Sequence, residues 1–170
     1  FYSGNENRPL LFKYHDASDP HSFVINCNGI SIGVLTDIGT VCEEVIHHFK
    51  QCHAVFLEAN YDATMLENGK YPIHLKNRIR GGHGHLSNKE ALDLFITHRS
   101  PNLSHLLLSH LSKENNSPEM VEALFKQYAN GITIAIAYRH RATEIFSISQ
   151  GTNNHAISKV SSSLQLGLFE

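Results

Sequence analysis

The sequence predicts a mixed α/β (α+β) fold in which helices pack on a sheet. Two observations lead to this class. The chain opens on a β-hairpin pattern, and after residue 36 short apolar strands alternate with capped helices. The length of 170 residues, 41% of them hydrophobic, fits one globular domain.

The opening pattern contains three predicted strands, at 10–14, 22–27 and 30–36. The dipeptide Asn28-Gly29 separates the second strand from the third, and this pair favours a two-residue hairpin turn. The chain is therefore expected to begin with antiparallel pairing.

Capping signals mark the start of three helices. Thr40-x-x-Glu43 has capping-box spacing and predicts a helix over 41–51, and Ser87-x-x-Glu90 begins a second helix in the same way. Ser117-Pro118 supplies an N-cap and a first-turn proline for a third helix, which is expected to close at Asn130-Gly131.

Short apolar runs predict the remaining strands, at 54–57, 106–108, 132–136 and 145–148. The run at 54–57 is expected to be buried and to end in a polar loop at 58–60. Loops at strand ends are where functional sites often lie. We expect one domain over 1–149, followed by a Ser- and Asn-rich polar tail over 150–170.

Composition excludes several classes of protein. The net charge of −2 excludes a globally basic nucleic-acid coat, although a local patch can still bind phosphate. The apolar runs are far shorter than the roughly 18–20 residues of a membrane-spanning helix, so no membrane association is expected. Three cysteines, without C-x-x-C spacing, favour a reducing compartment, the cytoplasm.

Histidine is over-represented, with 13 residues where a chain of this length usually has about four. His15, Asp37 and His110 each follow a predicted strand directly. A sheet holds ligands rigidly at its strand ends, and imidazole with carboxylate suits zinc or a similar divalent ion. For each residue alone, the alternative interpretation is a solvated loop position.

The segment His83-Gly84-His85-Leu86-Ser87-Asn88 precedes a capped helix. A histidine in this loop could transfer a proton, and the amides at the helix start could hold a phosphate. A flexible turn is the alternative. The segment is not an H-x-H-x-D-H metal motif, because Ser87 and Asn88 stand where Asp and His are needed.

Four basic residues lie between Lys70 and Arg80, where a short helix is expected after Tyr71-Pro72. This charge suits a phosphodiester backbone, and a solvated helix face is the alternative interpretation. The substrate contacts expected from the two segments are Lys76, Arg78, Ser87 and Asn88.

Five segments resemble, in order and spacing, the second half of metallo-β-lactamase-fold hydrolases of the YycJ/WalJ-like branch. They are 14–20, 35–39, 57–62, 84–88 and 108–112. Each segment alone has little specificity, but the order and spacing of all five are specific. The resemblance covers about residues 10–148.

This resemblance implies a four-layer αββα sandwich, of which the chain would hold the C-terminal half to two-thirds. It also implies a phosphodiesterase or nuclease that uses two divalent metal ions, zinc or manganese, and attack by a metal-bound hydroxide. His15, Asp37 and His110 would be metal ligands, and His85 would donate a proton to the leaving group.

The H-x-H-x-D-H motif of this family is absent from the 170 residues. We therefore expect a C-terminal fragment of a longer enzyme, with weak or partial metal occupancy and little turnover alone. One face of the sheet would be left uncovered, to be filled by the missing N-terminal half or by a second copy in a homodimer.

Two other functions stay open on the sequence. One is a non-catalytic remnant that binds phosphate-containing partners through 70–80 and the helix start at Ser87. The other is a hydrolase of a small phosphodiester or a thioester, because this fold hosts many chemistries.

Overall fold

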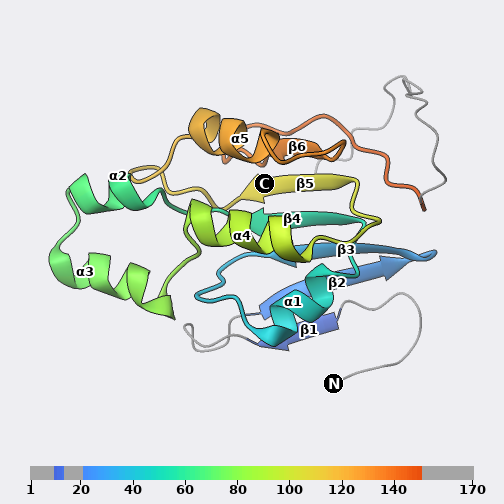
Figure 1. Ribbon diagram of the computed structural model, residues 1–170, viewed down its shortest axis with the longest axis horizontal. Helices are drawn as coiled ribbons and strands as arrows, with labels where there is room; N and C mark the ends of the chain where they lie inside the picture. Colours follow the sequence, from blue (N-terminus) through green and yellow to red (C-terminus); the bar gives the residue numbers. More distant parts are fainter. Residues whose placement is uncertain (1–9, 14–20, 151–170) are drawn as a thin grey trace.

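One six-stranded mixed sheet forms the centre of the computed structural model, which describes residues 10–13 and 21–150 (Figure 1). The strands, in their order across the sheet, are β1 (Leu10–Lys13), β2 (His21–Cys27), β3 (Ile30–Leu35), β4 (Ala54–Glu58), β5 (His105–Ser109) and β6 (Thr133–Ile136). The first three strands pair antiparallel, and β3 to β6 run parallel. His15 and the tail over 151–170 lie outside the described residues.

The predicted hairpin between β2 and β3 is confirmed. Asn28 and Gly29 both have positive φ, at 48° and 75°, as the turn requires, and Cys27 pairs with Ile30 across it.

Helices α1 (Glu43–Phe49), α4 (Asn88–His98) and α5 (Pro118–Lys126) pack on one face of the sheet (Figure 1). Their fully buried rings, Phe49, Phe95 and Phe125, share one core with the inward residues of the strands. The rings of Phe95 and Phe125 are 5.8 Å apart. Each such burial stabilises the fold by about 1.5–3 kcal/mol relative to an exposed ring, so this layer fixes the strand ends.

Three short helical segments lie between β4 and α4. These are α2 (Ala63–Asn68), α3 (Ile73–Arg78) and the π-helical turn η1 (Ile79–His83). In Figure 1, α2 and α3 lie at the left, beyond the carboxyl ends of β4 and β5. Among the described residues, no helix combines the length and the apolar character needed to cross a bilayer.

The opposite face of the sheet is apolar and has no helix on it among the described residues. Phe23 is 36% exposed and Ile25 46%, while their neighbours Val34 and Phe56 are half-buried. The segment after β6 reaches this face, where the ring of Phe146 lies 5.2 Å from that of His105. The uncovered face expected for part of an αββα sandwich is therefore present in the described residues.

Three details of the predicted elements are wrong. The helix predicted over 41–51 begins at Glu43 behind Cys42, without the side-chain cap expected from Thr40. The third helix ends at Lys126, and the left-handed turn at Asn130-Gly131 follows it separately. Residues 145–148 are not a strand, and Ile145 is 93% exposed, so this segment lacks the burial that a strand of the sheet would have.

Candidate metal centre

The parallel strands bring their carboxyl ends to one edge of the sheet. Asp37 follows β3, Glu58 ends β4, and His110 follows β5. These strands are direct neighbours, with Leu35 opposite Leu57 and Glu58 opposite Ser109. Residues that are far apart in the sequence therefore meet here, as they do at the strand ends of other parallel sheets.

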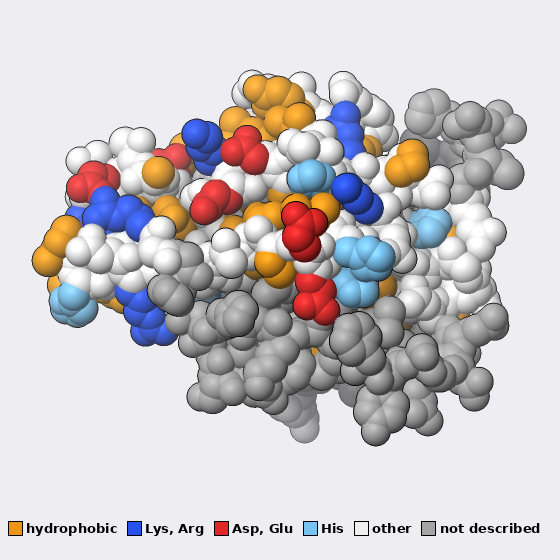
Figure 2. Space-filling model, turned by 60° about the horizontal axis from the view of Figure 1, so that its bottom comes forward, with side chains coloured by type: hydrophobic (Ala, Val, Ile, Leu, Met, Phe, Trp, Pro, Cys, Tyr) orange, Lys and Arg blue, Asp and Glu red, His pale blue; other side chains and the backbone are white. Residues whose placement is uncertain are grey.

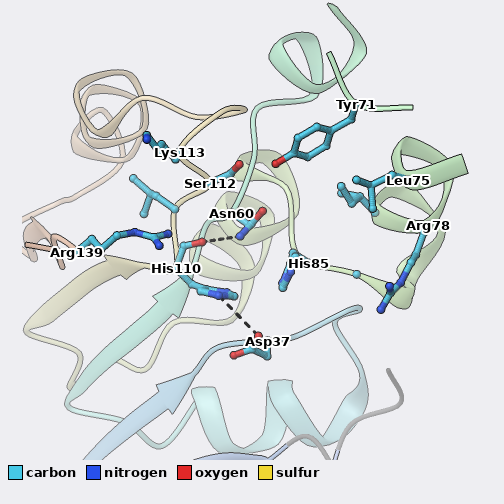
Figure 3. A pocket seen from close by; sticks show the side chains of 13 residues that line it. Asp37, Asn60, Tyr71, Leu75, Arg78, His85, His110, Ser112, Lys113 and Arg139 are labelled. Atoms are coloured by element: carbon cyan, nitrogen blue, oxygen red, sulfur yellow. Dashed lines mark hydrogen bonds and ion pairs between the residues drawn. The ribbon is translucent and has the colours of Figure 1, made fainter. Parts of the chain in front are cut away.

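Three predicted site residues form a cluster at this edge (Figure 3). One ligand atom from each of Asp37, His85 and His110 lies within 4.8 Å of the others. The Nε2 of His110 is 3.8 Å from the Oδ1 of Asp37, and the two imidazole rings are 4.8 Å apart. The fourth residue, His15, lies outside the described residues.

Glu58 is fully buried, and its carboxylate contacts both imidazole rings. Its Oε1 accepts a hydrogen bond from Nδ1 of His110 at 2.8 Å, and its Oε2 accepts one from the amide of Ile38 at 2.7 Å. The Nδ1 of His85 makes an ion-pair contact of 2.7 Å with the same Oε1. A carboxylate behind a histidine is the usual outer partner of a metal-ligating imidazole.

The surroundings of Glu58, above all its bond with His110, favour its ionised form. Burial acts to raise the pKa of Glu58, but the hydrogen bond from His110, the close contact with the His85 ring and the bond from the Ile38 amide together outweigh it, so the pKa lies below its ordinary value of 4.5. The hydrogen bond to Glu58 raises the pKa of His110 above 6.5, although burial and the charge of Arg139 oppose the shift. With the proton of the neutral ring fixed on Nδ1, Nε2 faces Asp37 as a lone-pair donor.

Asp37 and His110 both have left-handed backbone conformations, with φ of 58° and 56°. This conformation is uncommon in residues other than glycine, and the residues that adopt it cluster at functional sites. Two side chains at the end of β4 hold the backbone beside them. Glu58 binds the amide of Ile38, and the amide nitrogen of Asn60 donates to the carbonyl of His110 at 2.6 Å.

A cavity of about 520 Å³ lies over the cluster (Figure 3). Tyr71 and Leu75 form one wall from the side of α3, and Lys113 and Arg139 form another. The cluster therefore opens into a space large enough for a small ligand, with an apolar and aromatic wall facing a basic one.

The four predicted substrate contacts have different surroundings. Arg78 lines the cavity, whereas Lys76, Ser87 and Asn88 are not among its lining residues. Ser87 caps α4 in the predicted box with Glu90, and the side chain of Asn88 is buried against Asn116. Contact of these residues with substrate stays a prediction.

The basic stretch between Lys70 and Arg80 is partly neutralised. Arg80 pairs with Glu67 at 2.6 Å, and Lys76 donates to the carbonyl of Glu67 at 2.5 Å. Figure 2 shows basic and acidic side chains close together at its left end, where α2 and α3 lie. This end of the molecule is therefore not a uniformly basic surface.

The donor atoms of the cluster fit a divalent metal ion. Two ligands about 2.1 Å from one tetrahedral zinc ion are about 3.4 Å apart, and the 3.8 Å between Asp37 and His110 is close to this value. Imidazole and carboxylate are ligands that zinc and manganese accept. His85 adds a second imidazole at the same place.

Two residues that organise the cluster were not predicted as site residues. Glu58 and Asn60 belong to the segment predicted as a polar loop, yet Glu58 is fully buried and Asn60 is 9% exposed. Their position at the end of a buried parallel strand, level with Asp37 and His110, was the signal that could have identified them.

The chain is similar in sequence to two named relatives. No family model matches the chain. It is 31% identical over 113 residues to exodeoxyribonuclease YycJ of Bacillus anthracis, and 34% identical over 106 residues to exodeoxyribonuclease WalJ of Streptococcus pneumoniae. The matches cover 66% and 62% of this chain but 43% and 39% of the relatives, so the chain spans about two-fifths of their length.

A solved structure agrees on the fold. The metallo-β-lactamase-fold protein YhfI of Bacillus subtilis matches with a TM-score of 0.53 and 16% identity, over 80% of this chain and 52% of that one. The chain thus has the metallo-β-lactamase fold, a class in which such a donor set implies a divalent metal ion. Within it, the resemblance to the YycJ/WalJ-like branch is confirmed.

Proposed function

We propose that the chain supplies part of the active site of a metal-dependent phosphodiesterase that acts on DNA. The observation that carries the proposal is the convergence of Asp37, His85 and His110 within 4.8 Å of one another at the edge where the parallel strands end. The substrate class is suggested by the relatives, which are named exodeoxyribonucleases.

In this proposal Asp37, His110 and His15 hold the metal. A bound divalent ion supplies Lewis-acid activation of the phosphate and of the attacking water. Glu58 fixes the ring of His110 through Nδ1, so that Nε2 is directed at the side of Asp37. The charge of Glu58 also strengthens His110 as a donor.

His85 has the role of proton donor to the leaving group. Its Nδ1 lies beside the carboxylate of Glu58, which leaves the other ring nitrogen for the transfer. The wall formed by Tyr71 and Leu75 excludes water from one side of the cavity, and Arg78 is positioned to contact a phosphate there.

The remaining metal ligands come from outside this chain in our proposal, because two described ligands are fewer than a catalytic site needs. The apolar sheet face around Ile25 and Phe56 then packs against the rest of the protein, with a second copy as the alternative. The chain alone is expected to bind metal weakly. The expected compartment is the cytoplasm, and Cys27, Cys42 and Cys52 are all free thiols.

Cleavage of labelled DNA by the full-length protein, with zinc or manganese, tests the proposal. Asp37→Asn and His110→Ala should each lower metal affinity and abolish cleavage. His74→Ala, an exposed histidine on α3, is the matched control and should leave both unchanged. Tight DNA binding that persists after chelation, without hydrolysis in either metal, would instead support the non-catalytic alternative.

A separate experiment tests the role of His85. If His85 donates a proton, His85→Ala lowers the cleavage rate by about 10²–10⁴-fold while zinc affinity stays near that of the unchanged protein. A fall in zinc affinity as large as that of His110→Ala would make His85 a ligand. An unchanged rate would remove it from the mechanism.

A further inference from the structure

A second cavity of about 700 Å³ continues from the first along the segment after β6. The residues common to both cavities are His110, Leu111, Ser112, Lys113 and Arg139. Beyond them, the second cavity is lined by residues 136–138, 140 and 141, together with Asn116 and Pro118. We call this continuation the basic groove. Because the two cavities share lining residues, the basic groove is continuous with the cavity over the cluster.

The basic groove carries concentrated positive charge. Lys113, Arg139 and Arg141 line it, and no Asp or Glu is among its lining residues. Arg139 also lines the cavity over the cluster, so the positive charge extends to it. The exposed Glu119 is an acidic neighbour. Hydrogen bonding to Ser117 lowers the pKa of Glu119, and the charge of Arg141 acts in the same direction.

This local charge contrasts with the net charge of −2 of the whole chain. A basic groove in an acidic protein concentrates an anionic ligand at one place. A polynucleotide has a phosphate at every step, and three cations along a groove match such a repeating anion better than they match a single phosphate.

An aromatic side chain with an arginine above it forms part of the same groove. The guanidinium carbon of Arg141 is 3.6 Å from the centre of the Tyr138 ring. Tyr138 is half-buried against the core, so the ring is anchored, whereas Arg141 is exposed. Aromatic rings and guanidinium planes are the surfaces on which proteins stack unpaired bases.

The groove offers little for reading base identity. The amide of Asn116, which lines it, already bonds to Asn88 and to the carbonyls of Ala59 and Asn60. Stacking and phosphate contacts tolerate any sequence. The size of the cavity is that of sites for nucleotide-sized ligands and is too small for a duplex.

We propose that the basic groove binds the single DNA strand that runs on from the scissile phosphate. Lys113, Arg139 and Arg141 contact its phosphates, and a base stacks on the Tyr138–Arg141 pair. The assignment rests on the proposed phosphodiesterase function, because that function places a DNA strand at the cluster.

Binding of a fluorescent single-stranded oligodeoxynucleotide to the full-length protein tests the groove without catalysis. Anisotropy is measured in a chelator over a range of salt concentrations. Arg141→Gln should weaken binding about tenfold and reduce the slope of log K against log salt by about 0.7, the value for one phosphate contact on a single strand. Lys50→Gln, an exposed cation at the end of α1, is the charge-matched control and should change neither.

Two further variants separate stacking from charge. Arg141→Lys should keep the salt slope but recover only part of the affinity, since lysine lacks a planar group. Tyr138→Leu keeps an apolar side chain against the core and should weaken binding with an unchanged slope. Thermal unfolding of each variant confirms that it is folded.

Unchanged affinity in Arg141→Gln, or an equal loss in Lys50→Gln, would overturn the groove assignment. Tighter binding of RNA of the same sequence would overturn the assignment to DNA. DNA binding that depends on the groove, without hydrolysis in zinc or manganese, would support the groove assignment and would refute the proposed phosphodiesterase function instead.

Discussion

Replacing Glu58 with glutamine changes the group that holds His110 while keeping its shape. The amide oxygen of glutamine can still accept from the amide of Ile38, now at 2.7 Å from Oε2. The amide nitrogen then takes the place of Oε1, which accepts from Nδ1 of His110 at 2.8 Å. Two N–H donors cannot face each other, so His110 must move its proton to Nε2, the nitrogen that faces Asp37.

These contacts set the expected losses of stability and of zinc affinity. Glu58→Gln removes one charge-assisted hydrogen bond at a fully buried site, which stabilises a protein by about 1.5–3 kcal/mol. We expect the free energy of unfolding in chelator to fall by about 2 kcal/mol. Because the proton on Nε2 blocks metal binding, we expect zinc affinity to fall about 10–100-fold, as for other outer partners of metal-ligating histidines.

Urea unfolding in chelator measures the first effect, and zinc titration against a chromophoric chelator measures the second. Glu67→Gln is the matched control, since Glu67 is 58% exposed and its pairing with Arg80 is at the surface. We expect it to change stability by less than about 0.5 kcal/mol and zinc affinity not at all. Full stability and full zinc affinity in Glu58→Gln would refute the role given to Glu58.

Three further predictions follow from the same structure. In chelator, the Glu58–His110 pair should stabilise the protein most between pH 4.5 and 6.5, the ordinary pKa values of the two groups. The His110 contribution is complete below pH 6.5 and is lost as the pH rises through its raised folded-state pKa. That of Glu58 is present above pH 4.5 and is lost as the pH falls through its lowered folded-state pKa. Urea unfolding from pH 4 to 9 checks this, and a stability that is level over that range would contradict it. Asp37→Val should lower the unfolding free energy by about 1–3 kcal/mol, because φ of 58° is strained for a β-branched residue, whereas Asp37→Gly should not; equal losses would argue against backbone strain. Burial raises the pKa of Cys52 to about 12, so at pH 8 a thiol reagent should modify the exposed Cys27 and leave Cys52 intact in the folded protein, as peptide mapping can show.

Local signals predicted the elements whose partners lie close in the sequence. The box of Ser87 and Glu90 formed as expected, because both halves of its hydrogen bonding lie within one helical turn. The hairpin at Asn28-Gly29 formed for the same reason. Thr40 failed as a cap because the helix begins later, at Glu43, and the position of that first turn depends on packing of Val45 and Phe49 against the sheet.

The sequence predicted three residues of the candidate site but not the buried carboxylate that contacts its two imidazoles. Asp37 and His110 were expected from their strand-end positions, His85 from the loop before a capped helix, and all three from the family resemblance. Glu58 was expected to begin a polar loop, because a charged residue after a buried strand is usually solvated and its partners are not its neighbours in the sequence. Its partners, Ile38 and His110, are 20 and 52 residues away in the chain.

The sequence by itself determined the hairpin, the helix caps at Ser87 and Ser117, most of the strands and helices, and the chemical types of the candidate ligands, since periodicity and turn chemistry act over a few residues. Only the tertiary structure decided that three strand ends share an edge and that a buried carboxylate sits behind two imidazoles. It also decided that the cluster continues into a basic groove. Parallel pairing joins residues that are distant in the chain, and hydrogen bonds formed across that distance leave no local pattern.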